Sequence, residues 1–152
     1  MNDLILRRAS SEDMDRILQL QVRVFEGEQG IPASLVPISE ENSPIWWCAY
    51  MAENLVGAVA AWDFETQMHL GRYAIQPDYR GLHIGTRLAQ FAIEDIFSRT
   101  IDKLYIEARD ITVKIISKMG GEVVGEPSKF YDGMVTPMIL SKENYRKAKQ
   151  TG

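Results

Sequence analysis

Apolar residues recur at helical spacing near the start of the chain. Ser10 is a suitable N-cap residue, and the acidic Glu12 and Asp13 that follow suit the positive end of a helix. The spacing therefore predicts an amphipathic helix after Ser10, preceded by a short strand over 4–8. The stripe that would face the core consists of Met14, Ile17, Leu18, Gln21, Val24 and Phe25.

From Ile45 the pattern changes to runs of β-branched and aromatic residues separated by short polar turns. It predicts strands over 46–51, 55–63 and 67–75, with turns at 52–54 and 64–66. Because turns this short join neighbouring antiparallel strands, the three strands should form a meander.

The second half alternates between the two periodicities. A helix should follow Gly85, and a strand over 103–108 should direct Leu104, Ile106 and Ala108 to one face and Tyr105 and Glu107 to the other. A short helix ending at Gly120-Gly121 and strands over 122–124 and 134–140 complete an α/β order with a mixed sheet. Pro137 should mark a bulge or a partial edge in the last strand.

Composition narrows the class of protein. The 152 residues fit one domain, expected over residues 1–140, with a polar, frayed surface tail over 141–152. A net charge of -4 argues against nucleic-acid binding and favours a cationic small-molecule partner. No apolar run could span a membrane, and the amino end lacks the features of a signal peptide, so we expect a cytoplasmic protein. One cysteine and two histidines offer no metal-ligand spacing, so no metal is expected.

The segment from Tyr73 to Leu88 carries the main functional signal. A strand runs out at Pro77, a loop framed by Gly81 and Gly85 follows, and a helix begins. The glycines allow close backbone approach, and the free N–H groups at a helix start attract anions, so the segment is suited to a pyrophosphate. It lacks the Gly-Lys-Ser/Thr end of a Walker loop and the three spaced glycines of a dinucleotide fingerprint.

This segment resembles the acyl-coenzyme A loop of the GNAT acetyltransferase superfamily: arginine or glutamine, two residues, glycine, one residue, then glycine or alanine. Arg80, His83 and Gly85 stand at the three specified positions, with histidine replacing the first glycine. The order of elements also matches, and residues 24–32 are similar to a signature of the ElaA-like branch. The resemblance implies a mixed, mostly antiparallel sheet of about seven strands flanked by helices and splayed between the fourth and fifth strands.

The resemblance also implies a donor site for acetyl-coenzyme A. Backbone groups of Ala74 and Ile75 would pair with the pantetheine arm, and the Ile75 N–H would polarise the thioester carbonyl. The pyrophosphate would be wrapped by Arg80, Gly81, Leu82, His83, Ile84, Gly85 and Thr86. The implied reaction is direct attack by a small, cationic amine, once deprotonated, in a ternary complex.

Candidates for the acid and base remain open. Glu28 and Glu107 are candidate bases, each balanced against an ordinary surface role. The tyrosine that serves as acid in the family is replaced by Ile116, although Lys118 and Gly120 keep their places. Candidate substitutes are Tyr105, Tyr131 and Tyr73, unless the coenzyme A thiol leaves without an acid.

The loss of this tyrosine keeps a second hypothesis open, namely a non-catalytic acyl-coenzyme A binding or sensing module. The acceptor is not encoded in any readable motif. An exposed last strand would also allow a homodimer.

Overall fold

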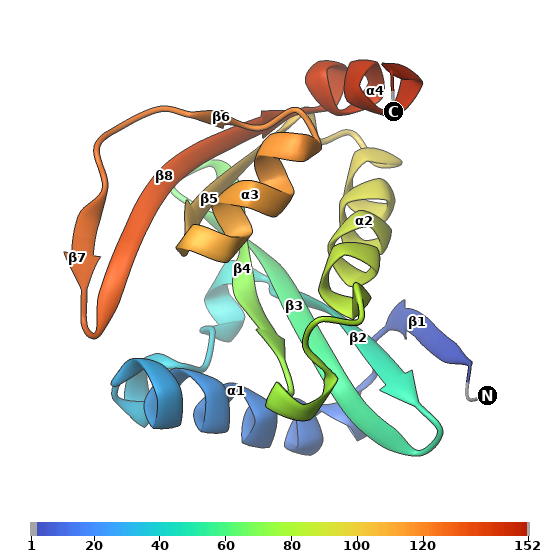
Figure 1. The fold of residues 1–152 in the computed structure, drawn as a ribbon, viewed down its shortest axis with the longest axis vertical. Helices are drawn as coiled ribbons and strands as arrows, with labels where there is room; N and C mark the ends of the chain where they lie inside the picture. The colour runs from blue at the N-terminus through green and yellow to red at the C-terminus, as the bar shows by residue number, and fades with distance from the viewer. Residues whose placement is uncertain (1–2, 152) are drawn as a thin grey trace.

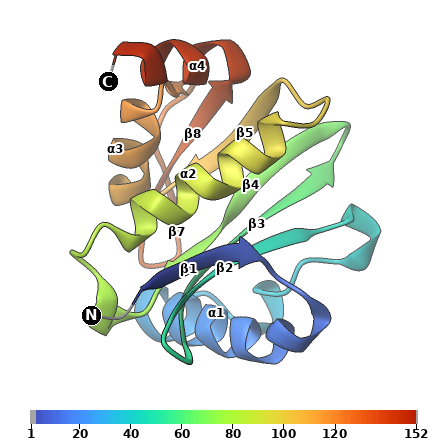
Figure 2. The same ribbon diagram turned by 90° about the vertical axis from the view of Figure 1, so that its right-hand side faces the viewer.

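The computed structural model describes residues 3–151 and contains one open sheet with helices on both faces (Figures 1 and 2). Over these residues the eight strands follow the order β1-β2-β3-β4-β5-β8-β6, with β7 also paired to β8. The strands are β1 (Leu4–Arg8), β2 (Ile45–Met51), β3 (Asn54–Phe64), β4 (Gln67–Ile75), β5 (Lys103–Ala108), β6 (Glu122–Val123), β7 (Ser128–Phe130) and β8 (Gly133–Ser141). The helices are α1 (Met14–Gln29), α2 (Ile84–Phe97), α3 (Asp110–Lys118) and α4 (Lys142–Thr151).

Helix α1 covers one face of the β2–β4 meander, and α2 covers the other (Figure 2). A single turn over Ser11–Asp13 precedes α1, and the Ser10 N–H donates to the Asp13 carboxylate at 2.8 Å, as a capping box requires. Of the predicted stripe, Ile17, Gln21 and Val24 are buried, whereas Met14, Leu18 and Phe25 are half-buried. Ile17 and Val24 pack with Trp46 and other inward residues of the meander. The alternate residues of the same strands point to the other face and pack against α2, so the sheet separates two apolar layers.

The sheet opens between β4 and β5. All other neighbouring strands are antiparallel, whereas these two are parallel and are in register only at His69 and Tyr105. Beyond that pair, the carboxyl-terminal halves of both strands diverge. The splay expected between the fourth and fifth strands is thus confirmed.

A β-bulge bends β4 where it leaves β5. The register passes from Ala58 opposite Ala74 to Ala60 opposite Gly71, so that Arg72 and Tyr73 together oppose one β3 residue. Arg72 has a φ of 54°, and its carbonyl accepts a 2.7 Å hydrogen bond from the fully buried Gln21 side chain of α1. The α1 helix therefore stabilises the bend.

The carboxyl-terminal segment differs from its prediction as a frayed tail. It forms α4, because Tyr145 is buried against Phe97 with 5.7 Å between ring centroids and the Ser141 hydroxyl accepts from the Asn144 N–H. The division at residue 140 stays a prediction, and residues 1, 2 and 152 lie outside the described range. No bulge occurs at Pro137: the β5–β8 register is unbroken there, and its missing N–H falls between the β6 and β7 pairings.

Candidate active site

The loop between β4 and α2 presents free backbone N–H groups. After a turn over Pro77–Tyr79, Gly81 has a φ of 82° and His83 a φ of 61°, and α2 starts at Ile84. Histidine is thus accommodated in a left-handed conformation at the position where the family motif has glycine. Within residues 3–151 none of the N–H groups from Gly81 to Thr86 donates a hydrogen bond. The geometry suits the predicted pyrophosphate contact, which stays a prediction.

Arg80 joins this loop to two other elements. Its Nε donates to the Ile75 carbonyl at 3.0 Å, and its two terminal nitrogens donate to the Glu28 carboxylate at 2.7 and 3.0 Å. The Arg80 side chain therefore links the end of β4 to the last turn of α1. Glu28, expected as a candidate base, instead has both oxygens engaged and does not line the cavity described below.

The end of β4 offers a backbone edge to the splay. The Gln76 N–H donates to the Val56 carbonyl of β3 at 2.8 Å. Because successive residues of a strand direct their N–H groups to opposite edges, the Ile75 N–H faces away from β3, toward β5. Ala74 is buried and pairs with Ala58 of β3. The donor contacts expected of Ile75 and Ala74 stay predictions.

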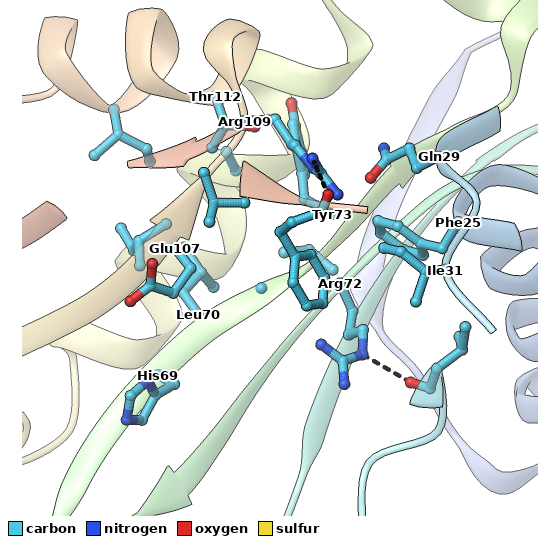
Figure 3. Close-up of a pocket in the computed structure, with 18 of the residues that line it drawn as sticks. Phe25, Gln29, Ile31, His69, Leu70, Arg72, Tyr73, Glu107, Arg109 and Thr112 are labelled. Atoms are coloured by element: carbon cyan, nitrogen blue, oxygen red, sulfur yellow. Dashed lines mark hydrogen bonds between the residues drawn. The ribbon is translucent and has the colours of Figure 1, made fainter. Parts of the chain in front are cut away.

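A cavity of about 370 Å³ occupies the opening between the diverging strands (Figure 3). Its lining comes from both faces of the sheet, including α1 on one side and α2 and α3 on the other. Most of the lining is apolar, and the polar residues are Gln29, His69, Arg72, Tyr73, Glu107, Arg109 and Thr112. In Figure 3, Glu107 and His69 lie on one side of the cavity, and Gln29 with Phe25 and Ile31 lies on the other.

Several buried polar atoms at this cavity have no hydrogen-bond partner among the described residues. They are the Gln29 Oε1, the His69 Nε2, the Tyr73 hydroxyl and the Arg109 Nη2. Burial raises the pKa of Tyr73, so the phenol stays protonated at neutral pH. Since buried polar groups are almost always paired, their concentration at one cavity marks it as a ligand site.

The predicted catalytic residues are not all brought together. Glu107 lines the cavity, whereas Tyr105 packs on His69 with 5.8 Å between ring centroids and does not line it. Tyr131 lies exposed in the β7–β8 turn, with a φ of 53°. Ile116, in place of the family tyrosine, is buried and lines the cavity. The catalytic roles of these residues and of Glu28 stay predictions.

Arg72 is a cavity residue that the sequence analysis missed. The sequence does contain a signal for it. The core-facing residues of β4 are the even-numbered Met68 and Leu70 and then the odd-numbered Tyr73 and Ile75, and this change in the two-residue alternation requires an extra residue between them. That phase change predicts a bulge and places Arg72 at the opening.

Between residues 3 and 151, no group of three or more His, Cys, Asp or Glu side chains could hold a metal ion. No helix in the described range is long and apolar enough to cross a membrane.

Comparison with known proteins extends the resemblance beyond the loop. A profile of the acetyltransferase (GNAT) family matches residues 12–120. No curated protein matches the chain in sequence. Many solved structures match in fold. Escherichia coli ElaA superposes with a TM-score of 0.78 at 18% identity, covering 93% of this chain and 100% of ElaA.

Two further structures illustrate the range of matches. An acyl-CoA N-acyltransferase from Pseudomonas aeruginosa gives a TM-score of 0.76 at 19% identity, covering 93% of this chain and 100% of that one. FeeM, an N-acyl amino acid synthase from uncultured soil microbes, gives 0.80 at 14% identity, covering 97% and 96%. At these identities the similarity to each of these structures, ElaA included, concerns the fold alone. The profile, however, spans α1 to the end of α3, and we conclude that the chain belongs to the GNAT acetyltransferase family, with the fold of an acyltransferase that uses an acyl-coenzyme A donor.

Proposed function

We propose that this protein transfers an acetyl group from acetyl-coenzyme A to the amino group of a small molecule, by direct attack in a ternary complex. The observation that supports this most is the cavity at the splay, which is lined from both faces of the sheet. Donor and acceptor can therefore meet there from opposite sides. That a similar structure is an acyl-CoA N-acyltransferase supports nitrogen as the acceptor atom.

The reaction needs a neutral amine. Its nitrogen attacks the thioester carbon, so a C–N bond forms and the C–S bond breaks, and coenzyme A leaves as a thiolate that takes up a proton. The surplus proton of the amine passes to a base. Holding both reactants in one cavity makes the attack effectively intramolecular, which lowers the entropic part of the barrier.

We assign the Ile75 N–H to the thioester carbonyl oxygen, and Glu107 to the base. The N–H lies at the splay edge of β4, where a preorganised donor would stabilise the developing oxyanion. Glu107 is the carboxylate among the cavity residues and is in no recorded ion pair of the described range. Tyr73 is the tyrosine among them, and its protonated phenol is the candidate donor for the leaving sulfur.

A second candidate function is acyl-coenzyme A binding without turnover. The observation behind it is Ile116, an apolar side chain with 1% exposure at the position of the family acid. A hydrocarbon side chain cannot protonate a thiolate. On this reading the cavity would hold the donor without assisting transfer.

The test is coenzyme A release from acetyl-coenzyme A with a panel of primary amines and amino acids, read with a thiol reagent. We expect release above the hydrolysis blank for at least one acceptor, and a fall of about 10²- to 10⁴-fold in kcat for Glu107→Gln. Glu126→Gln, at an exposed position outside the cavity, is the matched control. If no acceptor exceeds the blank while calorimetry shows donor binding, the binding function is favoured. Absence of donor binding would refute both functions.

A further inference from the structure

Two arginine side chains line the cavity from different elements. Arg109 comes from the N-cap of α3 and Arg72 from the bulge of β4 (Figure 3). Neither belongs to any of the ion pairs recorded among residues 3–151. Two guanidinium groups thus face a cavity whose lining contains one carboxylate, that of Glu107.

Arg109 is held in place with one nitrogen left over. Its Nη1 donates to the Phe130 carbonyl at 3.0 Å, and the guanidinium carbon lies 5.5 Å from the centroid of the Phe130 ring. Its Nη2 is buried and has no partner among the described residues. The contacts with β7 fix the direction of the fork, and the free Nη2 keeps donor capacity for an oxygen acceptor.

Arg72 is fixed in a similar way. Its Nε donates to the Val36 carbonyl at 2.7 Å, its Nη2 donates to the Leu35 carbonyl at 3.1 Å, and its guanidinium lies over the Trp62 ring at 5.3 Å. All these partners are neutral, so the charge of Arg72 is desolvated without being compensated. Burial lowers the pKa of both arginines, but arginine remains protonated near neutral pH.

The carboxylates near Arg109 lie at the surface. Asp110, at the start of α3, and Asp132, in the β7–β8 turn, are both exposed, and their charges raise the pKa of Arg109 against the lowering by burial. Neither makes a hydrogen bond with Arg109 in the described structure. Because the hydrogen-bond partners of Arg72 are neutral and the buried Nη2 of Arg109 has no acceptor among the described residues, the cavity favours an anionic group on its ligand.

We propose that the acceptor carries a carboxylate next to its amino group, as an α-amino acid does, and that Arg109 binds this carboxylate while Arg72 adds positive charge. The inference rests on the proposed function. The acceptor also has an apolar side chain, because the wall on the α1 side of the sheet is formed by Phe25, Ile31, Val36, Trp62 and Phe130. The expectation of a cationic acceptor rested on the charge of the whole chain, whereas the cavity itself contains more positive than negative groups.

The test compares acceptors that differ only in the carboxylate. Phenylalanine and phenethylamine form one pair, and leucine and isoamylamine form another. We expect kcat/KM for the amino acid to exceed that for the matched amine by about 10-fold or more, since a site built for a polar group discriminates against its absence. Arg109→Gln should abolish this preference through a higher acceptor KM, with the KM for acetyl-coenzyme A unchanged. Arg109→Lys should retain part of the preference.

Controls separate this inference from a folding defect and from failure of the proposed function. Arg146→Gln, at an exposed position of α4, should keep the preference, and thermal unfolding checks each variant. Binding of the same four compounds to the protein saturated with coenzyme A is measured by calorimetry. If the amino acids bind without turnover and Arg109→Gln removes that binding, the inference stands and the enzyme proposal fails. A preference for the amines, an Arg109→Gln effect confined to acetyl-coenzyme A, or binding of none of the four would overturn it.

Discussion

Replacing Gly85 with alanine should be unfavourable because of one neighbour, Tyr73. Gly85 is the second residue of α2 and has no positive φ, so its backbone suits alanine. A Cβ there would lie 2.1 Å from the Tyr73 hydroxyl oxygen and 3.1 Å from Cζ. The first distance requires the ring to move, and overpacking of this kind costs about 1–3 kcal/mol. Alanine regains at most about 1 kcal/mol through helix propensity, and less in the first turn.

The sign should change when the Tyr73 hydroxyl is removed. In Tyr73→Phe the nearest atom is Cζ at 3.1 Å, which a shift of the ring by a few tenths of an ångström relieves. In this background helix propensity determines the effect on stability, so adding Gly85→Ala to Tyr73→Phe should be neutral or should raise the free energy of unfolding by up to about 0.5 kcal/mol. Gly85→Ala alone should lower the free energy of unfolding by about 1–2 kcal/mol. The expected coupling energy is therefore about 1–2 kcal/mol.

The assay is urea denaturation of the wild type, both single variants and the double variant. The four free energies of unfolding form a double-mutant cycle. A coupling energy below about 0.5 kcal/mol would show that the Tyr73 hydroxyl does not lie against Gly85, and the assigned arrangement of the donor loop would be wrong. The Gly85→Ala variant should also have a raised KM for acetyl-coenzyme A, because the displaced Tyr73 ring enters the cavity.

Other changes probe the frame of the site. Asp13, with 4% exposure, accepts from Arg7 twice at 2.7 Å, and Asp13→Asn should lower stability by about 2–3 kcal/mol in denaturant titrations. The hydrogen bonds from Arg7 lower the pKa of Asp13, so the contribution of this pair to stability is complete above the ordinary carboxyl pKa and is lost as the pH falls through the lowered pKa. The free energy of unfolding of Asp13→Asn should therefore decrease less with falling pH than that of the wild type. Gly81→Ala should cost about 1 kcal/mol through its φ of 82° alone, and Gly81→Asn less. Glu28→Gln should raise the KM for acetyl-coenzyme A by freeing Arg80, with stability changed by under about 1 kcal/mol.

The sequence predicted what depends on local pattern. The two-residue period of β5 separates Leu104 and Ile106, which are buried, from Tyr105 and Glu107 on the other face. The order of elements and the splay followed from the resemblance. The left-handed conformation of His83 could also be expected from the sequence, because histidine tolerates that conformation better than most residues.

What depends on distant contacts was not predictable. Arg109 is aimed by the carbonyl of Phe130, from a strand of three residues with no alternating pattern. Helix α4 is held by the buried Tyr145 and by contacts to distant residues such as Asp102 and Glu94, whereas its polar composition alone indicates a frayed tail. The sequence gives no indication that Glu28 is paired, whereas in the structure it accepts a hydrogen bond from Arg80, 52 residues away.

The unpartnered groups of the cavity predict that donor and acceptor stabilise the protein together. A buried polar group without a partner costs about 1–3 kcal/mol, and a ligand that pairs with it recovers part of that cost. Arg109, which would contact the acceptor, lines the cavity, and the Ile75 edge, which would contact the donor, follows the cavity residue Tyr73 by two positions on β4, so each ligand would also exclude water from the other's contacts. We therefore expect the stabilisation by coenzyme A and phenylalanine together to exceed the sum of their separate effects, with a coupling free energy of about 1–3 kcal/mol. Calorimetric titration of each ligand with and without the other measures this coupling. Strictly additive binding would refute this coupling, and mutually exclusive binding would show that the ternary complex on which direct transfer depends does not form.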